Sequence, residues 1–172
     1  MRFDDFTTFI SNKDPNKLHF FDESSVVRTT GNMNYGSSVK GSRAFELQRY
    51  ASNANYTINL LLSRFGVDYF NVIDGASNSM ELIQFFADVV DVNNDKIANG
   101  FQIQPLFDLG DTIIMANCAF HYSNMVNNYL PQLLMQTGVV LKFQPPYHPQ
   151  LNTCEYCFHI IEQILRSDSD YF

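Results

Sequence analysis

The order of the predicted elements indicates a single α/β domain in which helices flank a mixed β-sheet. Short turns join the strands in the first half of the chain, as in an antiparallel meander. In the second half, strands alternate with helical segments, which is the pattern of parallel strands joined by crossover helices. The length of 172 residues and a hydrophobic fraction of 45% suffice for one domain with its own core.

Composition and charge narrow the class of protein further. Charged residues make up only 17% of the chain and Phe alone contributes 16 residues, which is typical of a globular protein. The net charge of -7 argues against a module that holds nucleic acid by charge alone, although acidic clusters built for metal ions would lower the charge in the same way. The chain has neither an apolar run of the about 18 residues that span a membrane nor a signal peptide, so we expect an intracellular protein.

The three cysteines exclude a complete disulfide framework. Cys154 and Cys157 form a C-x-x-C pair, but a zinc site on this pair would need a further ligand, such as Cys118 or a distant histidine. We therefore expect reduced thiols packed along a helix.

The first half of the chain predicts a sheet with one long excursion. Residues 1–17 are polar and mixed, and we interpret them as a lead-in or a trimmed linker before a domain of residues 18–172. The first strand, residues 18–21, leads directly into Asp22. Residues 31–41 are rich in Gly, Asn and Ser and predict a flexible excursion. Three strands are predicted after it, in a meander: residues 44–50, 56–63 and 67–73.

The second half predicts alternating helices and strands. A helix is expected over residues 80–90, with Ser and Asn side chains just before it as N-caps. The connection 91–110 lacks a clear period and holds one short element near residues 101–107. Pro131 predicts a break or kink inside the next helix. The remaining predicted elements are a buried strand, that helix and a last strand: residues 112–115, 124–136 and 139–143.

A proline-rich turn connects the last strand to the C-terminal helix. Three prolines within five positions, Pro145, Pro146 and Pro149, exclude both a strand ladder and a helix there. Asn152 is a good N-cap for the helix that follows, and Glu155 then falls at N3, where a carboxylate closes a capping box. The same position would hold a carboxylate at the end of the sheet. Glu155 thus has a structural and a chemical interpretation, and the local pattern favours the structural one.

The stretch from Pro145 to Glu155 reads Pro-Pro-Tyr-His-Pro-Gln-Leu-Asn-Thr-Cys-Glu. It resembles the pattern Pro-Pro-Tyr-Ser-Pro-Asp-Leu-Asn-Pro-Ile-Glu of mariner-like DDE transposases, and seven positions agree in order. The resemblance extends over residues 18–165, nearly the whole chain. Three further blocks resemble the same family: Phe21-Asp22-Glu23-Ser24, Tyr35-Gly36 with Lys40-Gly41 and Arg43-Ala44, and Ile73-Asp74-Gly75 with Asn78-Ser79.

The resemblance implies an RNase H-like fold with a five-stranded mixed sheet, and a DDE endonuclease that hydrolyses phosphodiesters and transfers DNA strands. Such enzymes use three carboxylates to hold two Mg²⁺ or Mn²⁺ ions, which clamp the attacking and leaving oxygens. Asp22 matches the first carboxylate and Glu155 the third. The implied partners are DNA, as transposon ends and target, and a second copy of the chain in a homodimer. The implied location is intracellular, in the nucleus if the source is eukaryotic.

The second carboxylate of the family is missing. Its block, Met-Asp-Asn-Ala-x-x-His, corresponds to residues 115–121, in which Ala116 replaces the aspartate. The 38 residues between Ala116 and Glu155 fit the family's spacing, and Asp111 lies at the wrong end of the strand. An introduced change, which we favour, and a natural loss both explain the alanine. Either one predicts impaired ion binding and loss of catalysis.

Several further residues are candidates for supporting or DNA-contacting roles, each beside a structural alternative. Asn117 and His121 match the family block and would orient a metal ligand or a phosphate, or serve as ordinary loop residues. Asn152 would aim the third carboxylate by capping its helix. Glu23 and Asp74 are interpreted as solvated strand ends. The remaining candidates would approach DNA, or be ordinary turn and loop residues: Tyr147, His148, Lys40 and Arg43.

Two alternatives to a transposase core stay open. One is a non-catalytic nucleic-acid or protein interaction module derived from such an enzyme, and the other is an RNase H-like nuclease that does not transpose. Full-length family members carry N-terminal helix-turn-helix domains that bind transposon ends, and the 17 residues before the first strand are too few for one. We therefore expect the sequence-specific DNA-binding domain to be absent from this chain.

Overall fold

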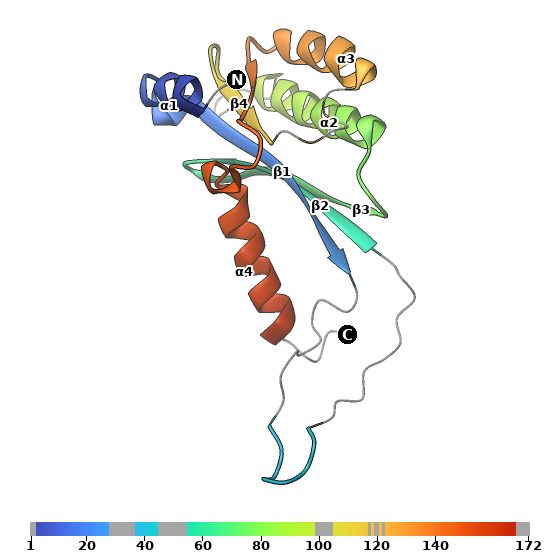
Figure 1. Cartoon of the computed structure of the whole chain (residues 1–172). Helices are drawn as coiled ribbons and strands as arrows, with labels where there is room; N and C mark the ends of the chain where they lie inside the picture. Colours follow the sequence, from blue (N-terminus) through green and yellow to red (C-terminus); the bar gives the residue numbers. More distant parts are fainter. Residues whose placement is uncertain are drawn as a thin grey trace.

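Helices cover both faces of a five-stranded sheet in the computed structural model, which describes residues 3–27, 37–44, 55–98, 105–116, 118, 121 and 123–167 (Figure 1). The strand order is β3-β2-β1-β4-β5. The first three strands are antiparallel, whereas β4 runs parallel to β1 and β5 runs parallel to β4. The predicted mixed α/β class is therefore confirmed. The bounds of the strands are β1 (Leu18–Val27), β2 (Asn55–Ser63), β3 (Gly66–Asp74), β4 (Thr112–Met115) and β5 (Val140–Phe143).

The first strand is longer than the sequence analysis predicted, because it continues past Asp22 instead of ending there. β2 pairs with β1 from His19 to Val27, and this ladder holds the additional residues in the strand. β4 pairs with β1 only from Leu18 to Phe21. Beyond Phe21, β1 therefore has a strand partner on one side only among the described residues. The predicted strand 44–50 lies outside the described residues, apart from Ala44.

The helix α2 (Ser79–Ala98) begins where the sequence predicted and ends eight residues later than the predicted end at residue 90. At its start, the Asn78 side chain accepts hydrogen bonds from the backbone N–H groups of Met80 and Glu81. Asn93, in the second half of the helix, is buried, and its side-chain oxygen accepts from the N–H of Phe107 at 2.9 Å. A polar residue thus occupies a core position, which is why the apolar pattern ends before the helix does.

The helix α3 (Asn124–Met135) runs through Pro131 without the predicted break. Proline has no backbone N–H to donate to the carbonyl one turn earlier in a helix. Both Pro131 and Asn127 lie on the exposed side of the helix. Leu130 and Leu134, on the other face, are buried in the core and hold the helix against the sheet.

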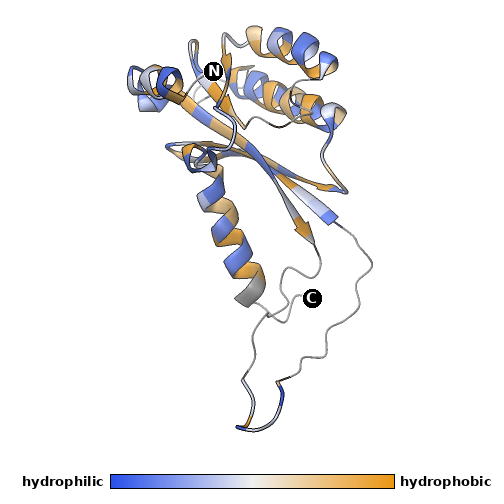
Figure 2. Ribbon diagram, in the orientation of Figure 1, coloured by the Kyte–Doolittle hydropathy of each residue, from blue (hydrophilic) through white to orange (hydrophobic). Residues whose placement is uncertain are grey.

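Two hydrophobic clusters fix the helices on the two faces of the sheet. The larger cluster joins α2 and α3 to one face, around Phe21, Leu61 and Ile113. The smaller one joins α4 (Cys154–Ser167) to the other face, around Leu60 and Leu62. Figure 2 shows hydrophobic residues interleaved with hydrophilic ones along α4, as expected for a helix with one buried face. Opposite sides of β1 therefore face different helices.

The structure adds a helix that the sequence analysis did not predict, α1 (Phe3–Ser11). Phe6 is buried and packs with Leu18 and Ile114, so the segment interpreted as a lead-in packs on the sheet. Phe3, Phe6 and Ile10 have helical spacing, which was the available signal. Short 3-10 helices are also described at η1 (Pro15–Lys17) and η3 (Pro149–Leu151). Within the described ranges, no helix is both long and apolar enough to cross a membrane.

Candidate functional site

Asp22 lies in the part of β1 that extends beyond β4, on the side of the sheet covered by α4. Successive side chains of a strand point to opposite faces, and Phe20, two residues earlier, packs into the α4 cluster. Asp22 pairs with Leu60 of β2, another residue of that cluster. The side chain is buried, and one carboxylate oxygen accepts a hydrogen bond from the N–H of Glu23 at 3.0 Å.

Asn152 fastens the start of α4 to this strand. Its side-chain N–H donates to the carbonyl of Phe21 at 3.0 Å, and its side-chain oxygen accepts from the N–H of Cys154 at 3.1 Å. This is the capping bond that the sequence predicted. The reciprocal bond of a capping box is not formed, because the N–H of Asn152 donates to the carbonyl of Pro149 instead. Glu155, one turn further, is exposed, so its carboxylate stays available for a ligand.

The charge around Asp22 is dominated by carboxylates. The pKa of Asp22 is raised to about 7: burial makes the largest contribution, and the charges of Glu23 and Glu155 add to it, whereas a hydrogen bond from the Glu23 N–H and the charge of His121 oppose the rise. At neutral pH the site therefore holds negative charge that is incompletely compensated. Such a site favours either a shared proton or a cation.

Ala116 stands immediately after β4 and offers no side-chain donor to this site. Its carbonyl accepts from His121 Nδ1 at 2.7 Å. Asp111 does not replace the missing carboxylate, because it lies at the other end of β4, where His19 and Lys17 contact it. Asp22 and Glu155 supply oxygen donors of the kind that Mg²⁺ and Mn²⁺ prefer, but nothing at position 116 completes the set. The residues present therefore fit one such ion better than a pair.

Glu23 faces the opposite side of the sheet from Asp22 and contacts His121. Glu23 Oε1 lies 2.9 Å from His121 Nε2, and the histidine is fully buried. Only 8% of the Glu23 side chain is exposed, so the interpretation of Glu23 as a solvated strand end was wrong. Its alternation with Asp22 along β1 was the sequence signal for this placement. Asp74 is exposed at the end of β3, as expected for a solvated strand end.

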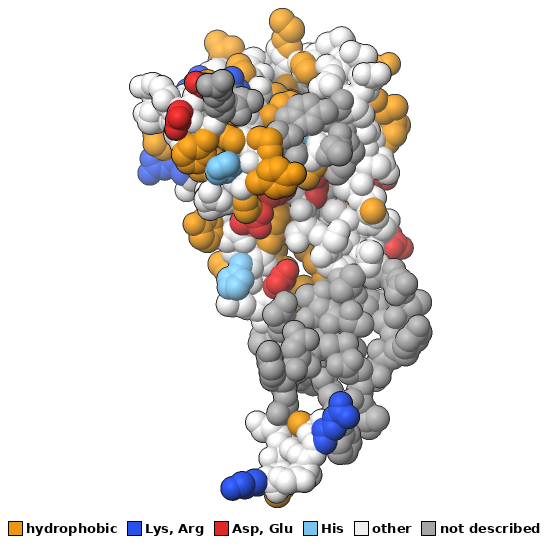
Figure 3. Space-filling view, in the orientation of Figure 1, with side chains coloured by type: hydrophobic (Ala, Val, Ile, Leu, Met, Phe, Trp, Pro, Cys, Tyr) orange, Lys and Arg blue, Asp and Glu red, His pale blue; other side chains and the backbone are white. Residues whose placement is uncertain are grey.

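No contact joins the other described candidates to Asp22 or Glu155. The Tyr147 side chain is 99% exposed, with a left-handed backbone at φ 61°. His148 Nδ1 donates to the carbonyl of Pro146 at 2.7 Å. Lys40 and Arg43 are exposed in the segment 37–44, whose basic side chains stand at the end of the molecule remote from α2 and α3 (Figure 3). Asn117 lies outside the described residues.

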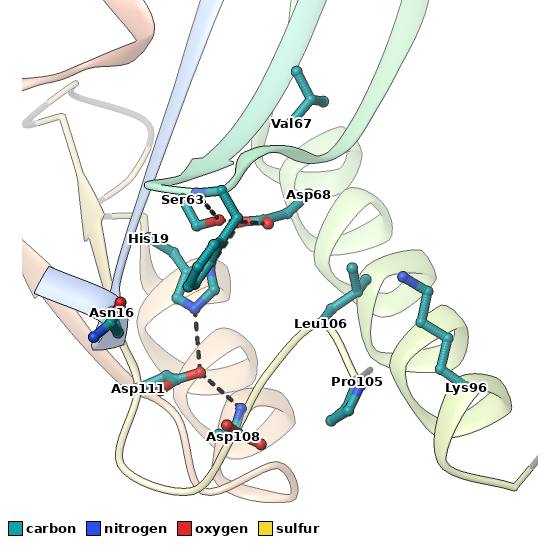
Figure 4. A pocket seen from close by; sticks show the side chains of 11 residues that line it. Asn16, His19, Ser63, Val67, Asp68, Lys96, Pro105, Leu106, Asp108 and Asp111 are labelled. Atoms are coloured by element: carbon teal, nitrogen blue, oxygen red, sulfur yellow. Dashed lines mark hydrogen bonds and ion pairs between the residues drawn. The ribbon is translucent and has the colours of Figure 1, made fainter. Parts of the chain in front are cut away.

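A second polar cluster, at the opposite end of β1, was missed by the sequence analysis. His19 Nδ1 lies 2.8 Å from Asp68, and its Nε2 lies 3.2 Å from Asp111 (Figure 4). Lys17 forms ion pairs with Asp111 and Asp108. His19 and its aspartate neighbours border a cavity of about 240 Å³. Burial lowers the pKa of His19, but the hydrogen bonds and charges of Asp68 and Asp111 outweigh it, so the net shift of that pKa is upward.

Comparisons with known proteins bear on the family and the fold of the chain. A family model described as "DDE superfamily endonuclease" matches residues 17–171. The chain is similar to the Mos1 mariner paired end complex with Mn, at 13% identity and a TM-score of 0.66 over 92% of this chain and 45% of that chain. It is also similar to the Mos1 strand transfer complex, at 14% identity, a TM-score of 0.67 and 94% and 45% coverage.

The isolated catalytic domain of Mos1 mariner transposase is a third similar structure, at 12% identity, a TM-score of 0.55 and 92% and 65% coverage. These likenesses show an RNase H-like α/β fold. The chain spans about 45% of the length of the first similar chains. A comparison with curated protein sequences finds no significant match.

Proposed function

The chain belongs to the DDE superfamily endonuclease family, and from this premise we propose that it is the catalytic core of a mariner-like DNA transposase whose activity is impaired at Ala116. The observation that carries the proposal is the Asn152 bridge. One amide side chain bonds both the carbonyl before Asp22 and the first turn of the helix that carries Glu155. Two carboxylates far apart in the chain are thereby held at one end of the sheet.

The proposed reaction is the cleavage and transfer of DNA phosphodiesters. Asp22 and Glu155 would hold a divalent cation, Mg²⁺ or Mn²⁺, which when bound stabilises negative charge on the phosphate oxygens and promotes deprotonation of the attacking water or hydroxyl. Asn152 keeps the two carboxylates at the same end of the sheet by joining β1 to the start of α4. The burial of Asp22 limits water at the site, which strengthens its attraction for a cation.

We propose that the missing carboxylate at position 116 lowers the affinity of this site for divalent cations. A third carboxylate would supply both a ligand and charge compensation, and removing a ligand costs at least about 10- to 100-fold in metal affinity. We therefore expect Ala116→Asp to bind Mn²⁺ at least about 10-fold more tightly than the unaltered chain in calorimetric titration. Ala116→Asn is the matched control, because it adds a side chain of similar size without the charge.

Nicking of supercoiled plasmid DNA in the presence of Mn²⁺ measures the proposed phosphodiester cleavage. Ala116→Asp should nick the plasmid, and the activity should disappear when Glu155→Gln is added to that variant. Nicking by the unaltered chain at the same rate as Ala116→Asp would contradict the impairment. An Ala116→Asp chain that is folded but shows neither tighter Mn²⁺ binding nor nicking would contradict the catalytic proposal.

The DNA partners are also proposals. The similar structures are described as complexes with paired transposon ends and as a strand transfer complex. We propose transposon ends and target DNA as the substrates here, a homodimer as the assembly, and a location inside the cell. The second candidate function is a non-catalytic DNA or protein interaction module, which the alanine at position 116 favours. Retained DNA binding together with the failure of Ala116→Asp would support that module.

A further inference from the structure

Three side chains of different chemistry converge on the α2 and α3 side of the sheet, beyond the end of β4. They are Glu23, Cys118 and His121, and one potential ligand atom of each lies within 4.8 Å of the others. We propose that these three residues form a binding site for a zinc-class divalent cation, separate from the pair formed by Asp22 and Glu155. Below, this group is called the Glu23 cluster.

The hydrogen bonds of His121 point to a cation. A carbonyl oxygen only accepts, so His121 Nδ1, 2.7 Å from the carbonyl of Ala116, carries a proton and donates it. In a neutral imidazole, Nε2 then presents a lone pair, and it faces Glu23 Oε1 at 2.9 Å. Burial lowers the pKa of His121, but the hydrogen bond and the charge of Glu23 outweigh it, so without a metal a proton occupies this contact. A metal ion bound between Nε2 and Oε1 would displace that proton to the solvent. Metal-binding histidines commonly donate their other ring N–H to a backbone carbonyl, as His121 does.

The donor set selects the class of cation. Zn²⁺ takes thiolate, imidazole and carboxylate ligands, and its catalytic sites combine three protein ligands with one open position. Mg²⁺ and Mn²⁺ prefer oxygen donors, so the Glu23 cluster and the carboxylate pair differ in the cations that they favour. Ligand atoms around a tetrahedral zinc ion lie about 3.6 Å apart, because zinc bonds are about 2.0 to 2.3 Å long. Glu23 Oε1 and His121 Nε2, now 2.9 Å apart, would separate by less than about 1 Å, and the longest separation in the cluster, at most 4.8 Å, would shorten by about 1 Å.

The thiol must lose its proton on binding. Burial and the charges of Glu23 and Asp22 raise the pKa of Cys118, so without a cation the thiol is protonated. Zinc binding replaces the S–H bond by a Zn–S bond and releases that proton to the solvent. The bound ion would tie β1, which carries Glu23, to the segment after β4, which carries Cys118 and His121.

Cobalt(II) provides the test, because it replaces zinc in such sites and a cobalt–thiolate bond gives a charge-transfer absorption. The whole chain should bind one equivalent of Co²⁺ with this absorption, and Zn²⁺ should displace the cobalt. Cys118→Ser should abolish the absorption and weaken Zn²⁺ binding by at least about 100-fold. Cys157→Ser is the matched control, since Cys157 packs in the α4 cluster. It should leave both signals unchanged.

Further variants separate this site from the catalytic proposal. Glu155→Gln should leave the cobalt absorption in place, whereas Glu23→Gln should weaken Zn²⁺ binding. Absence of the absorption at stoichiometric Co²⁺, or its persistence in Cys118→Ser, would overturn the proposal. Cobalt that binds without a thiolate signal and is lost in Glu155→Gln would overturn it too, while supporting a cation at the carboxylate pair. Failure of Ala116→Asp to gain Mn²⁺ affinity would leave the Glu23 cluster unaffected.

Discussion

At the His19 end of β1, acidic side chains are neutralised by cations of the chain itself, whereas around Asp22, three residues further along the same strand, the described residues neutralise them only in part. His19 sits between Asp68 and Asp111, and Lys17 contacts Asp111 from the other side. At the other end, the carboxylates of Asp22, Glu23 and Glu155 meet one buried histidine, His121.

The contrast distinguishes a structural cluster from a candidate site. Charges that are already paired within the fold have little affinity left for a ligand. Removing one charge of such a pair destabilises the folded state. The charges of Glu23 and Glu155 raise the pKa of the buried Asp22, and an external cation would relieve this unfavourable free energy. Substitutions at the two ends should therefore change stability in opposite directions.

The largest effect is expected at the compensated end. His19→Gln leaves the carboxylates of Asp68 and Asp111 without the buried positive charge between them, and breaking a buried pair in this way costs about 3 to 5 kcal/mol. The free energy of unfolding in urea at pH 6 measures it. His159→Gln, which changes an exposed histidine on α4, is the control and should be nearly neutral. A His19→Gln variant as stable as the control would remove the contrast between the two ends.

The destabilisation caused by His19→Gln should be larger at acidic than at alkaline pH. The pKa of His19 is raised in the folded chain, so its contribution to stability is complete below the ordinary histidine pKa of about 6.5. That contribution is lost as the pH rises through the raised pKa. The difference between His19→Gln and the unaltered chain should therefore shrink toward alkaline pH.

The sequence predicted the uncompensated end far better than the compensated one, for a physical reason. Asn152 and Glu155 lie in a local motif, where prolines and a cap determine the backbone within a few residues. His19 receives its partners from positions 49 and 92 residues away, and no local pattern encodes such distances. The bond between Glu23 and His121 spans 98 residues and was missed for the same reason.

Two errors in the predicted elements also arise from tertiary contacts. The second half of α2 is held by the bond between Asn93 and Phe107, which a search for apolar periodicity cannot detect. The predicted break at Pro131 neglected the packing of Leu130 and Leu134 in the core, which holds the helix against the sheet. The fold class did not depend on either residue, since it followed from the order of the elements.

A smaller effect, of opposite sign, is expected at Asp22. The pKa of this carboxyl is about 7 in the folded chain against an ordinary 3.8, so the folded state binds the proton more tightly and stability falls as the pH rises through that interval. The difference between these two pKa values limits the loss of stability from this carboxyl to about 4 kcal/mol. Asp22→Asn, measured with a chelator present, should raise the unfolding free energy at pH 8 by about 2 to 3 kcal/mol.

The gain should vanish near pH 3, where the carboxyl is protonated in both the folded and the unfolded chain. Asp74→Asn, at an exposed strand end, is the matched control and should change stability little at either pH. If Asp22→Asn destabilised the chain at pH 8, the carboxylate would be compensated by a group in the fold, and the two ends of β1 would not differ in the way described.

The smallest change in stability is expected at Asn152, but this substitution tests how the uncompensated end is assembled. Asn152→Ala removes the cap of α4 and the bond to the Phe21 carbonyl, at a cost of about 1 to 2 kcal/mol. Release of α4 would let Glu155 move away from Asp22. The pKa of Asp22, followed by NMR, should then fall toward its ordinary value, because one of the charges that raise it has receded.

Asn152→Asp gives the sharper comparison. It keeps an oxygen that can cap the helix but replaces the N–H donor that holds Phe21 by a second negative charge. The added charge should raise the pKa of Asp22, whereas Asn152→Ala lowers it, although both variants lose the bond to β1. Equal shifts in the two variants would mean that the pKa of Asp22 follows the loss of the bridge alone. No shift in either would mean that burial alone sets this pKa, and that Asn152 does not hold the two carboxylates together.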